Sequence, residues 1–335
     1  MNKLIESLKV LFGAKPARPD KDSFSIELKA IHKIKKFDPE RIKAIHEELA
    51  ENKKLPAIWR RRRWAVLITI NLLFVVSFWL DISILEGSLT ASRFIGFHMA
   101  DLNSALQVML AYKQIVLNLV IGTVTIFIMW WLLGGRTFCS WVCPYHLIAE
   151  WAESLHLILA DKGWVKDHPF DRRTRTWFWI IFVVLAIVTG YTVYESISPT
   201  GILSRALIYG PGLALIWVAL LLLFEIFYSR RAWCRYGCPI GLTYGLVGAI
   251  SPFKVQYHLV DCLHEGECRK VCMVPHVLDT VIKGKANDLN VDIGADCTRC
   301  GRCVEVCPTD SLTFVMKGIT KKPLSVPNKD NESNH

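Results

Sequence analysis

The sequence lacks several features that would assign it to common classes of protein. Its long apolar runs contain no histidine, which argues against a haem held between two membrane histidines. The first apolar run begins at residue 64 without an A-x-A site behind it, so we expect no cleavable signal peptide. A basic groove interleaved with aromatic residues, typical of nucleic-acid-binding proteins, is also missing. The formal net charge of +10 therefore has another origin.

Apolar residues, by contrast, are in excess. The chain has 335 residues, of which 52% are hydrophobic and twelve are tryptophan, which is more than soluble domains usually contain. Four uninterrupted apolar runs explain the excess, each about the twenty residues that cross a bilayer. They are Trp64–Leu85, Gln114–Leu133, Trp177–Tyr194 and Pro211–Tyr228. We therefore expect a polytopic membrane protein.

The basic residues predict how these spans are oriented. Arginine clusters precede the first and third spans and follow the fourth, and Arg136 follows the second. The opposite loops, around 86–113 and 195–210, carry only Arg93, Lys113 and Arg205. The positive-inside rule therefore puts both termini and all eleven cysteines in the cytoplasm. Disulfides rarely persist there, which favours metal ligation.

The most specific motif is a run of cysteines near the C-terminus. Its members, spaced C-x₂-C-x₂-C-x₃-C-P, are Cys297, Cys300, Cys303, Cys307 and Pro308. Bacterial ferredoxins have this spacing, with three thiolates on one [4Fe–4S] cluster and the fourth reaching a second cluster. A structural zinc site would instead pair two C-x₂-C knuckles. The run therefore predicts iron–sulfur chemistry and electron transfer.

An incomplete copy of this run precedes it. Cys262, Cys268 and Cys272 occupy offsets 0, 6 and 10, but Glu265 stands at offset 3. If the ferredoxin crossover applies, Cys272 completes the cluster of the later run, and Cys262 and Cys268 share the other with Cys307. That second site would hold a [3Fe–4S] cluster, or a [4Fe–4S] cluster with a ligand from Glu265, the preceding histidine or water. Alternatively, Glu265 is a solvated surface residue.

A second thiol motif occurs twice, after the second and fourth spans. Cys139 and Cys143 in one copy, and Cys234 and Cys238 in the other, share the pattern R-x-aromatic-C-x-aromatic-x-C-P at a separation of 95 residues. This indicates two parallel repeats related by an axis along the membrane normal. The thiolates could converge on one further iron–sulfur cluster, or each pair could serve a separate one. Dithiol redox chemistry, a copper site or a structural role are alternatives.

A helix is expected to follow the first copy, from Pro144 to about Ala160. Its apolar residues at helical spacing are Leu147, Trp151, Leu155 and Leu159. Glu150 and Glu153 lie off this stripe, as in an amphipathic helix on the inner membrane surface. We expect His146 and His156 on this helix to bind no metal.

Together these motifs resemble the NapH/MauN family of membrane ferredoxin-type proteins over about residues 60–318, and more distantly the NosR C-terminal region and CcoG. The resemblance implies a multi-pass protein of the bacterial inner membrane with cytoplasmic iron–sulfur clusters. It also implies quinol oxidation, or electron delivery from the quinone pool to other redox subunits with a periplasmic or cytoplasmic acceptor. Glu265 and Met273, which replaces the usual proline, depart from the pattern. A copper reductase or oxidase-assembly factor of the CcoG type, or a redox sensor, is the alternative.

Two residues of the first outer loop are candidates for a quinol contact. His98 and Asp101 lie close together in the sequence. Quinol oxidation needs a proton acceptor near the membrane edge, and histidine titrates near neutrality. The alternative is that the pair only structures the loop.

The expected architecture is an α-helical integral membrane protein, with four transmembrane helices as two repeated hairpins, and a C-terminal α+β domain of the two-cluster ferredoxin type. The parts are a basic cytoplasmic arm at 1–63, the membrane domain at 64–255, the ferredoxin-like domain at 256–318 and a disordered tail at 319–335. Within the arm, a helix is expected near Pro39–Asn52.

Overall fold

The computed structural model describes residues 2–16, 24–34, 57–81, 85–94 and 97–319, with the single positions 40, 43, 44 and 47. The expected helix near Pro39–Asn52 lies largely outside the described residues. The chain divides into two units. The first contains Met1–Pro16, Ile58–Ser251 and Gly294–Cys300, and the second contains Ala17–Ala57, Pro252–Ile293 and Gly301–His335. Each unit is described by itself below.

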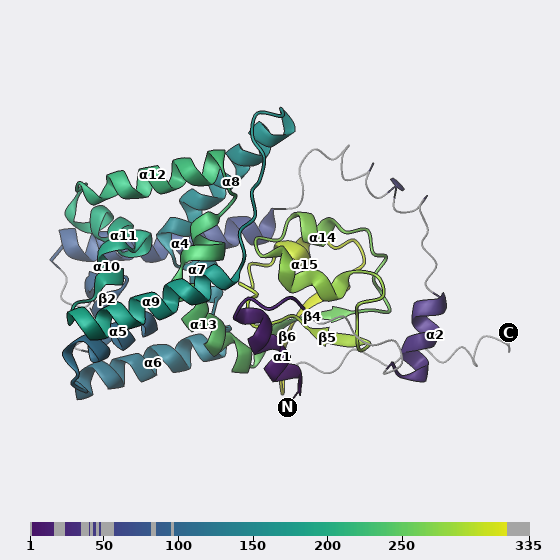
Figure 1. The fold of residues 1–335 in the computed structure, drawn as a ribbon, viewed down its shortest axis with the longest axis horizontal. Coiled ribbons are helices and arrows are strands. Elements are labelled where there is room, and N and C mark those ends of the chain that lie inside the picture. The colour runs from purple at the N-terminus through teal and green to yellow at the C-terminus, as the bar shows by residue number, and fades with distance from the viewer. Residues whose placement is uncertain are drawn as a thin grey trace. The chain divides into compact units, whose positions relative to one another are not determined.

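Four apolar helices form the frame of the first unit (Figure 1). They are α4 (Ile58–Trp79), α6 (Leu117–Leu133), α9 (Arg173–Thr189) and α12 (Ala214–Phe227). Each overlaps one of the four apolar runs of the sequence. Among the described helices, α4 alone has the length and hydropathy to cross a membrane by itself, while α6 and α12 are apolar but shorter. The first unit is therefore mostly helical.

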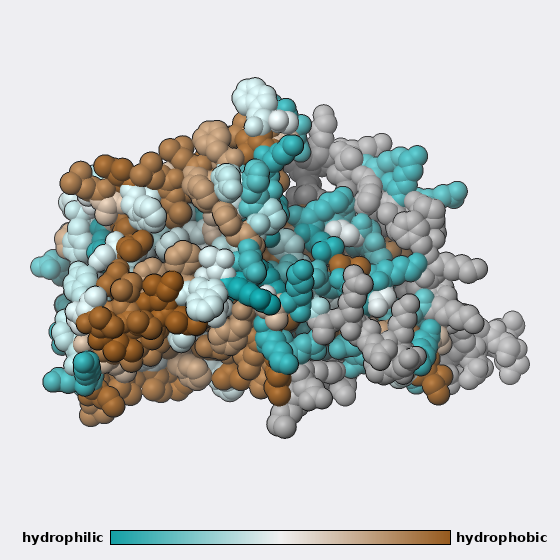
Figure 2. Space-filling view, in the orientation of Figure 1, coloured by the Kyte–Doolittle hydropathy of each residue, from teal (hydrophilic) through white to brown (hydrophobic). Residues whose placement is uncertain are grey.

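These helices present apolar side chains at the surface. Leu72, Ile128 and Leu220 are about half exposed, and Val188 is 76% exposed. Figure 2 shows such side chains gathered over α12, α9 and α6. Soluble monomers rarely expose contiguous apolar patches of this extent, so the surface is suited to an apolar surrounding.

The first unit is built from two halves that share a helix order: a long helix, a short helix, an apolar helix, the thiol motif and a last helix. After α4, the chain forms a small antiparallel sheet of β1 (Leu85–Ser88), β2 (Ala91–Phe94) and β3 (Phe97–Ala100). The first half continues with α5 (Leu102–Tyr112), α6, α7 (Thr137–Trp141) and α8 (Pro144–Asp161). The second half has α9, α10 (Val193–Ile197), α11 (Pro199–Tyr209), α12, η2 (Trp233–Gly237) and α13 (Pro239–Ile250). The two segments expected as outer loops thus contain the short helices α5 and α11.

The two halves interlock through their last helices. Helix α8 packs on α12 and α11 of the second half as well as on α4, and α13 packs on α6 and α5 of the first half as well as on α9. Pro144 and Pro239 begin these two helices, and the preceding cysteines have extended backbones, as proline requires of its predecessor. The exchange brings both cysteine motifs into the interior of the unit.

The orientation of α8 corrects one expectation. Glu150 is only 2% exposed and Glu153 is also buried, whereas Trp151 is 56% exposed and Leu155 is largely exposed as well. The expected water-facing position of the two acidic side chains is therefore wrong. They point inward because buried arginines meet them, Arg63 for Glu150 and an arginine of the second motif for Glu153.

The N-terminal segment contributes a helix that the sequence reading missed. In α1 (Asn2–Leu11), Leu11 is fully buried beside Leu242 of α13. Arg172 and Arg175 donate hydrogen bonds to the carbonyls of Val10 and Leu11 at 3.1 and 2.8 Å. These bonds satisfy carbonyl groups that the end of a helix leaves unpaired.

The second unit combines a small sheet with short helices. Its antiparallel sheet has the order β5-β4-β6, formed by β5 (Asn290–Asp292), β4 (Phe253–His258) and β6 (Leu312–Met316). Its helices are α2 (Ile26–Ile34), α14 (Glu267–Lys270), η3 (Pro275–Val281) and α15 (Arg302–Val306). In the register, Val255 lies opposite Phe314 and Tyr257 opposite Val291. This α+β composition agrees with the expectation for the cysteine-run region.

Candidate functional site

The two C-x₃-C-P motifs occupy equivalent places in the two halves of the first unit. Cys139 lies in α7 and Cys234 in η2, and both are partly buried. Cys143 and Cys238 immediately precede α8 and α13 and are buried. The π-helical form of η2 is a local departure from α-helix of a kind that is frequent at functional sites.

The four thiols lie close to one another. Burial raises the pKa of Cys139 to about 12 and that of Cys143 to about 11, and the nearby Cys238 adds to both shifts. Burial also raises the pKa of Cys234, with contributions from Cys143 and Cys238. A bound metal removes such a penalty because it ligates the deprotonated thiol. This buried set of four sulfur donors fits an iron–sulfur cluster or another soft metal.

Hydroxyl groups from the second half support the two buried thiols. The Sγ atom of Cys143 lies 3.1 Å from the Oγ1 atom of Thr200, in the first turn of α11. The Sγ atom of Cys238 lies 3.8 Å from the hydroxyl of Tyr194 in α10. Hydrogen bonds to ligand sulfurs tune the potential of an iron–sulfur centre. Sequence reasoning missed both residues, because they lie far from the motifs along the chain.

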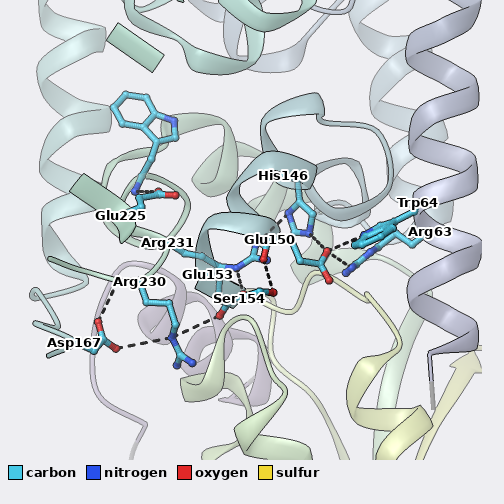
Figure 3. Close-up of polar contacts among 11 residues, drawn as sticks. Arg63, Trp64, His146, Glu150, Glu153, Ser154, Asp167, Glu225, Arg230 and Arg231 are labelled. Atoms are coloured by element: carbon cyan, nitrogen blue, oxygen red, sulfur yellow. Dashed lines mark hydrogen bonds and ion pairs between the residues drawn. The ribbon is translucent and has the colours of Figure 1, made fainter. Parts of the chain in front are cut away.

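Buried ion pairs hold α8 in place (Figure 3). Arg63 of α4 pairs with Glu150, which also accepts a hydrogen bond from the Trp64 indole at 3.1 Å. Arg231, which opens the second motif, pairs with Glu153. Both pairs have side chains less than a tenth exposed. They balance buried charge that would otherwise be costly.

Glu225, near the end of α12, serves the second motif in another way. Its carboxylate, labelled in Figure 3, accepts a hydrogen bond from the backbone N–H of Trp233 at 2.9 Å. Trp233 precedes Cys234 directly. The carboxylate therefore holds the start of η2, which is a structural role that the spacing of the motif does not reveal.

In the second unit, the ligands expected for the incomplete run lie together. Burial raises the pKa of Cys268 to about 12, and the Glu265 carboxylate, Cys262 and Cys307 add to the shift. Glu265 is 7% exposed, so its alternative interpretation as a solvated surface residue is wrong. The three thiols and this carboxylate are the set that the ferredoxin crossover predicts for the atypical cluster.

The backbone gives the two cysteine runs the same loop shape. The N–H of His264 donates to the Sγ atom of Cys262 at 3.3 Å, and the N–H of Arg299 donates to the Sγ atom of Cys297 at 3.4 Å. His264 and Arg299 both have positive φ angles, 60° and 53°. Hydrogen bonds from the backbone to ligand sulfurs are one of the controls on cluster potential.

The loops of the two cysteine runs also share a glycine, two residues after His264 in the first run and two residues after Arg299 in the second. Gly266 and Gly301 have φ angles of 86° and 80° and precede α14 and α15. Glu265 thus occupies, in the first loop, the place that Cys300 has in the second. The first run has kept the loop and changed one ligand position.

The thiols of the complete run, Cys297, Cys300, Cys303 and Cys307, are buried as well. Cys272, the last cysteine of the incomplete run, is also buried. Within the described ranges, no three His, Cys, Asp or Glu side chains close around a single metal ion. Single-ion coordination is a tighter arrangement than a cube of four irons requires of its thiolates.

The two quinol candidates have different outcomes. Asp101 is buried and caps α5, accepting hydrogen bonds from the N–H groups of Asn103 and Ser104 at 3.1 and 3.3 Å. This is the structural role that its alternative interpretation allowed. The backbone of His98 lies in β3, opposite Arg93, and its side chain is outside the part of the chain that the structure describes.

Asp101 has a second carboxylate as a neighbour. The hydroxyl of Ser104 bonds to Glu195 and lies 3.5 Å from the Oδ2 atom of Asp101. Burial raises the pKa of Asp101 to about 6, a hydrogen bond from Tyr244 opposes the rise, and Glu195 adds to it. A carboxyl group with this pKa can exchange protons near neutral pH.

Comparison with known proteins agrees with the two kinds of thiol motif. Residues 115–161 and 210–258 each match a family model described as a 4Fe-4S binding domain. The starts of these matches, like Cys139 and Cys234, are 95 residues apart. Residues 294–313 match a second model, also described as a 4Fe-4S binding domain. Both motif regions therefore have the sequence character of iron–sulfur domains.

Curated relatives decide the family. Over 208 residues the chain is 34% identical to "Methylamine utilization ferredoxin-type protein MauN" of Paracoccus denitrificans (strain Pd 1222), covering 62% of this chain and 72% of the relative. The chain belongs to the MauN/NapH family of ferredoxin-type proteins. It is also 29% identical over 272 residues to "Ferredoxin-type protein NapH" of Escherichia coli (strain K12), covering 77% of this chain and 91% of the relative.

A further MauN, from Methylobacillus flagellatus (strain ATCC 51484 / DSM 6875 / VKM B-1610 / KT), is 31% identical over 235 residues, covering 68% of this chain and 82% of the relative. No solved structure matches the chain. The resemblance drawn from the motifs is thus confirmed. As a member of the MauN/NapH family with 4Fe-4S binding domains, the protein is a ferredoxin-type iron–sulfur electron-transfer protein.

Proposed function

We propose that this protein is an iron–sulfur relay embedded in the bacterial inner membrane, which takes electrons from quinol and delivers them to other redox subunits. The observation that carries the proposal is that the thiols of Cys139, Cys143, Cys234 and Cys238 interact electrostatically with one another inside a helical unit with an apolar surface. A redox centre inside such a unit is within reach of an electron donor dissolved in the membrane. The ferredoxin-like cysteine runs then continue the path on the cytoplasmic side.

The membrane topology has two supports. Apolar side chains cover the outward faces of α4, α6, α9 and α12, and basic residues cluster at one end of the corresponding runs. Both termini are therefore cytoplasmic in the proposal. A reporter enzyme fused after His335 should read cytoplasmic, and one inserted at Gly210, between α11 and α12, should read periplasmic. The reverse pattern would overturn the topology.

Three ligand sets are proposed. Cys139, Cys143, Cys234 and Cys238 hold one centre. Cys272, Cys297, Cys300 and Cys303 hold a complete [4Fe–4S] cluster. Cys262, Cys268 and Cys307, with Glu265, hold the atypical cluster. When bound, such centres take up and release one electron at a time. The protein's own contribution is to hold the thiolates, to donate hydrogen bonds to them and to keep water away.

Quinol oxidation releases two electrons and two protons, so the protein must accept protons beside the membrane centre. Asp101, with Glu195 joined to it through Ser104, is the proposed acceptor. Its buried position means that a proton passes to it through neighbouring groups such as Tyr244. His98 is retained as a candidate for direct quinol contact.

The direct test uses the full-length protein, purified without oxygen in detergent. A quinol analogue should reduce the clusters, as followed by visible absorbance and EPR. Selective reduction of Cu(II), without reaction with quinol, would favour instead a metal reductase or assembly factor. Clusters that respond to redox poise but never turn over with either substrate would indicate a sensor.

A further inference from the structure

A short segment of the complete cysteine run belongs to the first unit and is tied to the first thiol motif. Arg136, which opens that motif, donates a hydrogen bond to the backbone carbonyl of Asp296 at 2.8 Å and pairs with its carboxylate. Arg175 pairs with the same carboxylate at 2.9 Å. All three side chains are buried. Asp296 immediately precedes Cys297, so this ion cluster fixes the first ligand of the run.

The motif helix α7 binds the same segment directly. The hydroxyl of Ser140 donates to the carbonyl of Thr298 at 2.8 Å, and the indole N–H of Trp141 lies 3.3 Å from the carbonyl of Arg299. Ser140 follows Cys139 in the sequence. Thr298 and Arg299 are the two residues between the first two cysteines of the run. The ligand loop of one centre is therefore hydrogen-bonded to the ligand loop of the other.

Two glycines, Gly134 after α6 and Gly248 in α13, allow this close approach. Arg299 is buried and donates to the carbonyls of Gly134 and Gly248, at 3.0 Å for the latter. A Cβ atom on Gly134 would overlap the side chain of Arg299, and one on Gly248 would lie 3.1 Å from the carbonyl oxygen of Gly134. Gly134 also has a φ angle of 111°, which other residues rarely adopt.

Among the described residues, the second thiol motif is held by a different partner. At a separation of 95 residues, the counterpart of Arg136 is Arg231, which pairs with Glu153 of α8 instead. The counterparts of the glycine pair at 134–135 are Ser229 and Arg230. The repeats therefore share their thiols but differ in the residues that receive the 294–300 segment.

Arg136 also lies near ligand thiols of both centres. Its guanidinium interacts electrostatically with the thiols of Cys139, Cys238 and Cys297. It is also bound to Asp296, which immediately precedes Cys297. A single buried positive charge therefore acts on sulfurs that belong to two proposed clusters.

We propose that electrons cross between the membrane centre and the ferredoxin-like cluster at the first thiol motif, and that Arg136 is the positioning residue that joins the two ligand loops there. The proposal rests on the proposed function, because it requires a centre at each loop. In each step one electron moves: the centre that gives it is oxidised, the centre that receives it is reduced, and no bond is made or broken.

The test is an EPR-monitored redox titration of the full-length, cluster-loaded protein. Removing a buried positive charge disfavours the more negative reduced state. Arg136→Gln should therefore lower the midpoint potentials of both the membrane centre and the Cys297–Cys303 cluster. The matched variant Arg231→Gln should lower that of the membrane centre alone. A shift confined to one centre in Arg136→Gln, or two shifted centres in Arg231→Gln, would overturn the proposal.

Two further variants keep the test decisive if Arg136→Gln loses iron. Arg136→Lys keeps the charge and should leave both potentials near those of the wild type, and Asp296→Asn removes the facing negative charge and should raise both. A change at one centre only contradicts the shared role. If the wild type shows no EPR signal from a centre at the C-x₃-C-P thiols, the proposed function is refuted. If the wild type shows both centres but the Arg136 and Asp296 variants change their potentials independently, only the inference is refuted.

Discussion

The thiol of Cys143 lies 3.1 Å from the hydroxyl of Thr200. The first belongs to the thiol motif of the first repeat, and the second begins α11, in the outer segment of the second repeat. The outer segment must therefore fold back toward the motif. The first repeat alone would leave the thiol of Cys143 without this hydroxyl, so the two halves build one site together.

Thr200→Val tests this contact because it keeps the side-chain shape and removes the hydroxyl. Loss of one hydrogen bond to a ligand sulfur should destabilise the reduced state of the membrane centre by about 1 kcal/mol. For a one-electron centre, this lowers the midpoint potential by a few tens of millivolts. Redox titration measures the shift. Thr189→Val, which removes a hydroxyl bonded to the α9 backbone, should leave the potential unchanged. Equal shifts in the two variants would contradict a specific contact.

Glu265→Cys restores the thiol that the ferredoxin spacing expects, in a loop that already has the right shape. A carboxylate is a weaker ligand for this iron than a thiolate, so that iron should be labile. The wild type should show a [3Fe–4S] signal or an unusual [4Fe–4S] signal, and the variant an ordinary low-potential [4Fe–4S] signal. Glu267→Cys, two residues further on at the start of α14, should leave the wild-type signal. Two ordinary four-thiolate clusters in the wild type would show the ligand assignment to be wrong.

The buried pair Arg63–Glu150 should matter for stability. Glu150→Ala leaves the Arg63 guanidinium buried without its carboxylate, which should cost about 3 to 5 kcal/mol of unfolding free energy. Thermal unfolding of the detergent-solubilised protein measures the loss. Lys43 and Glu47 form an exposed ion pair on one helical face, and Glu47→Ala should change stability little. Comparable losses in the two variants would argue against the buried network.

Quinol-dependent reduction should depend on pH through Asp101. Because its pKa is raised to about 6, the carboxyl already holds a proton below that pH and accepts one above it. The rate of cluster reduction should therefore rise between pH 5 and 7. Asp101→Asn, which keeps a side chain suited to capping α5, should remove this rise and slow the reaction about 100-fold or more. Glu86→Gln, at an exposed carboxylate of β1, should keep the wild-type profile, and an unchanged profile in Asp101→Asn would exclude the role.

The sequence predicts the long helices well because their signal is local. Uninterrupted apolar runs indicate α4, α6, α9 and α12, and the proline after each motif indicates where α8 and α13 begin. The short helices α5 and α11 were not predicted. Their buried polar residues, such as Asn103 and Ser204, resemble those of an exposed loop when read without their partners.

Long-range pairing accounts for the other differences. Glu150 and Glu153 are buried because each pairs with an arginine. These arginines lie 87 and 78 residues away in the sequence, so the helical periodicity around Glu150 and Glu153 could not reveal them. The cysteine spacings, by contrast, identify the candidate ligands directly. The pairing of Arg136 with Asp296 was not predicted. The sequence shows only that both motif copies begin with an arginine, and it does not show the partner of either one.

The most direct measurement compares the EPR redox titration and iron content of the wild type with those of Cys139→Ser, Cys234→Ser and the double variant. One serine comes from each repeat, so the comparison asks whether the two motifs serve a single centre. We predict that each single variant loses the same signal and the same amount of iron, and that the double variant loses little more, as expected for residues that act as a unit. Independent, additive losses from the two motifs, or no loss at all, would contradict a shared iron–sulfur centre.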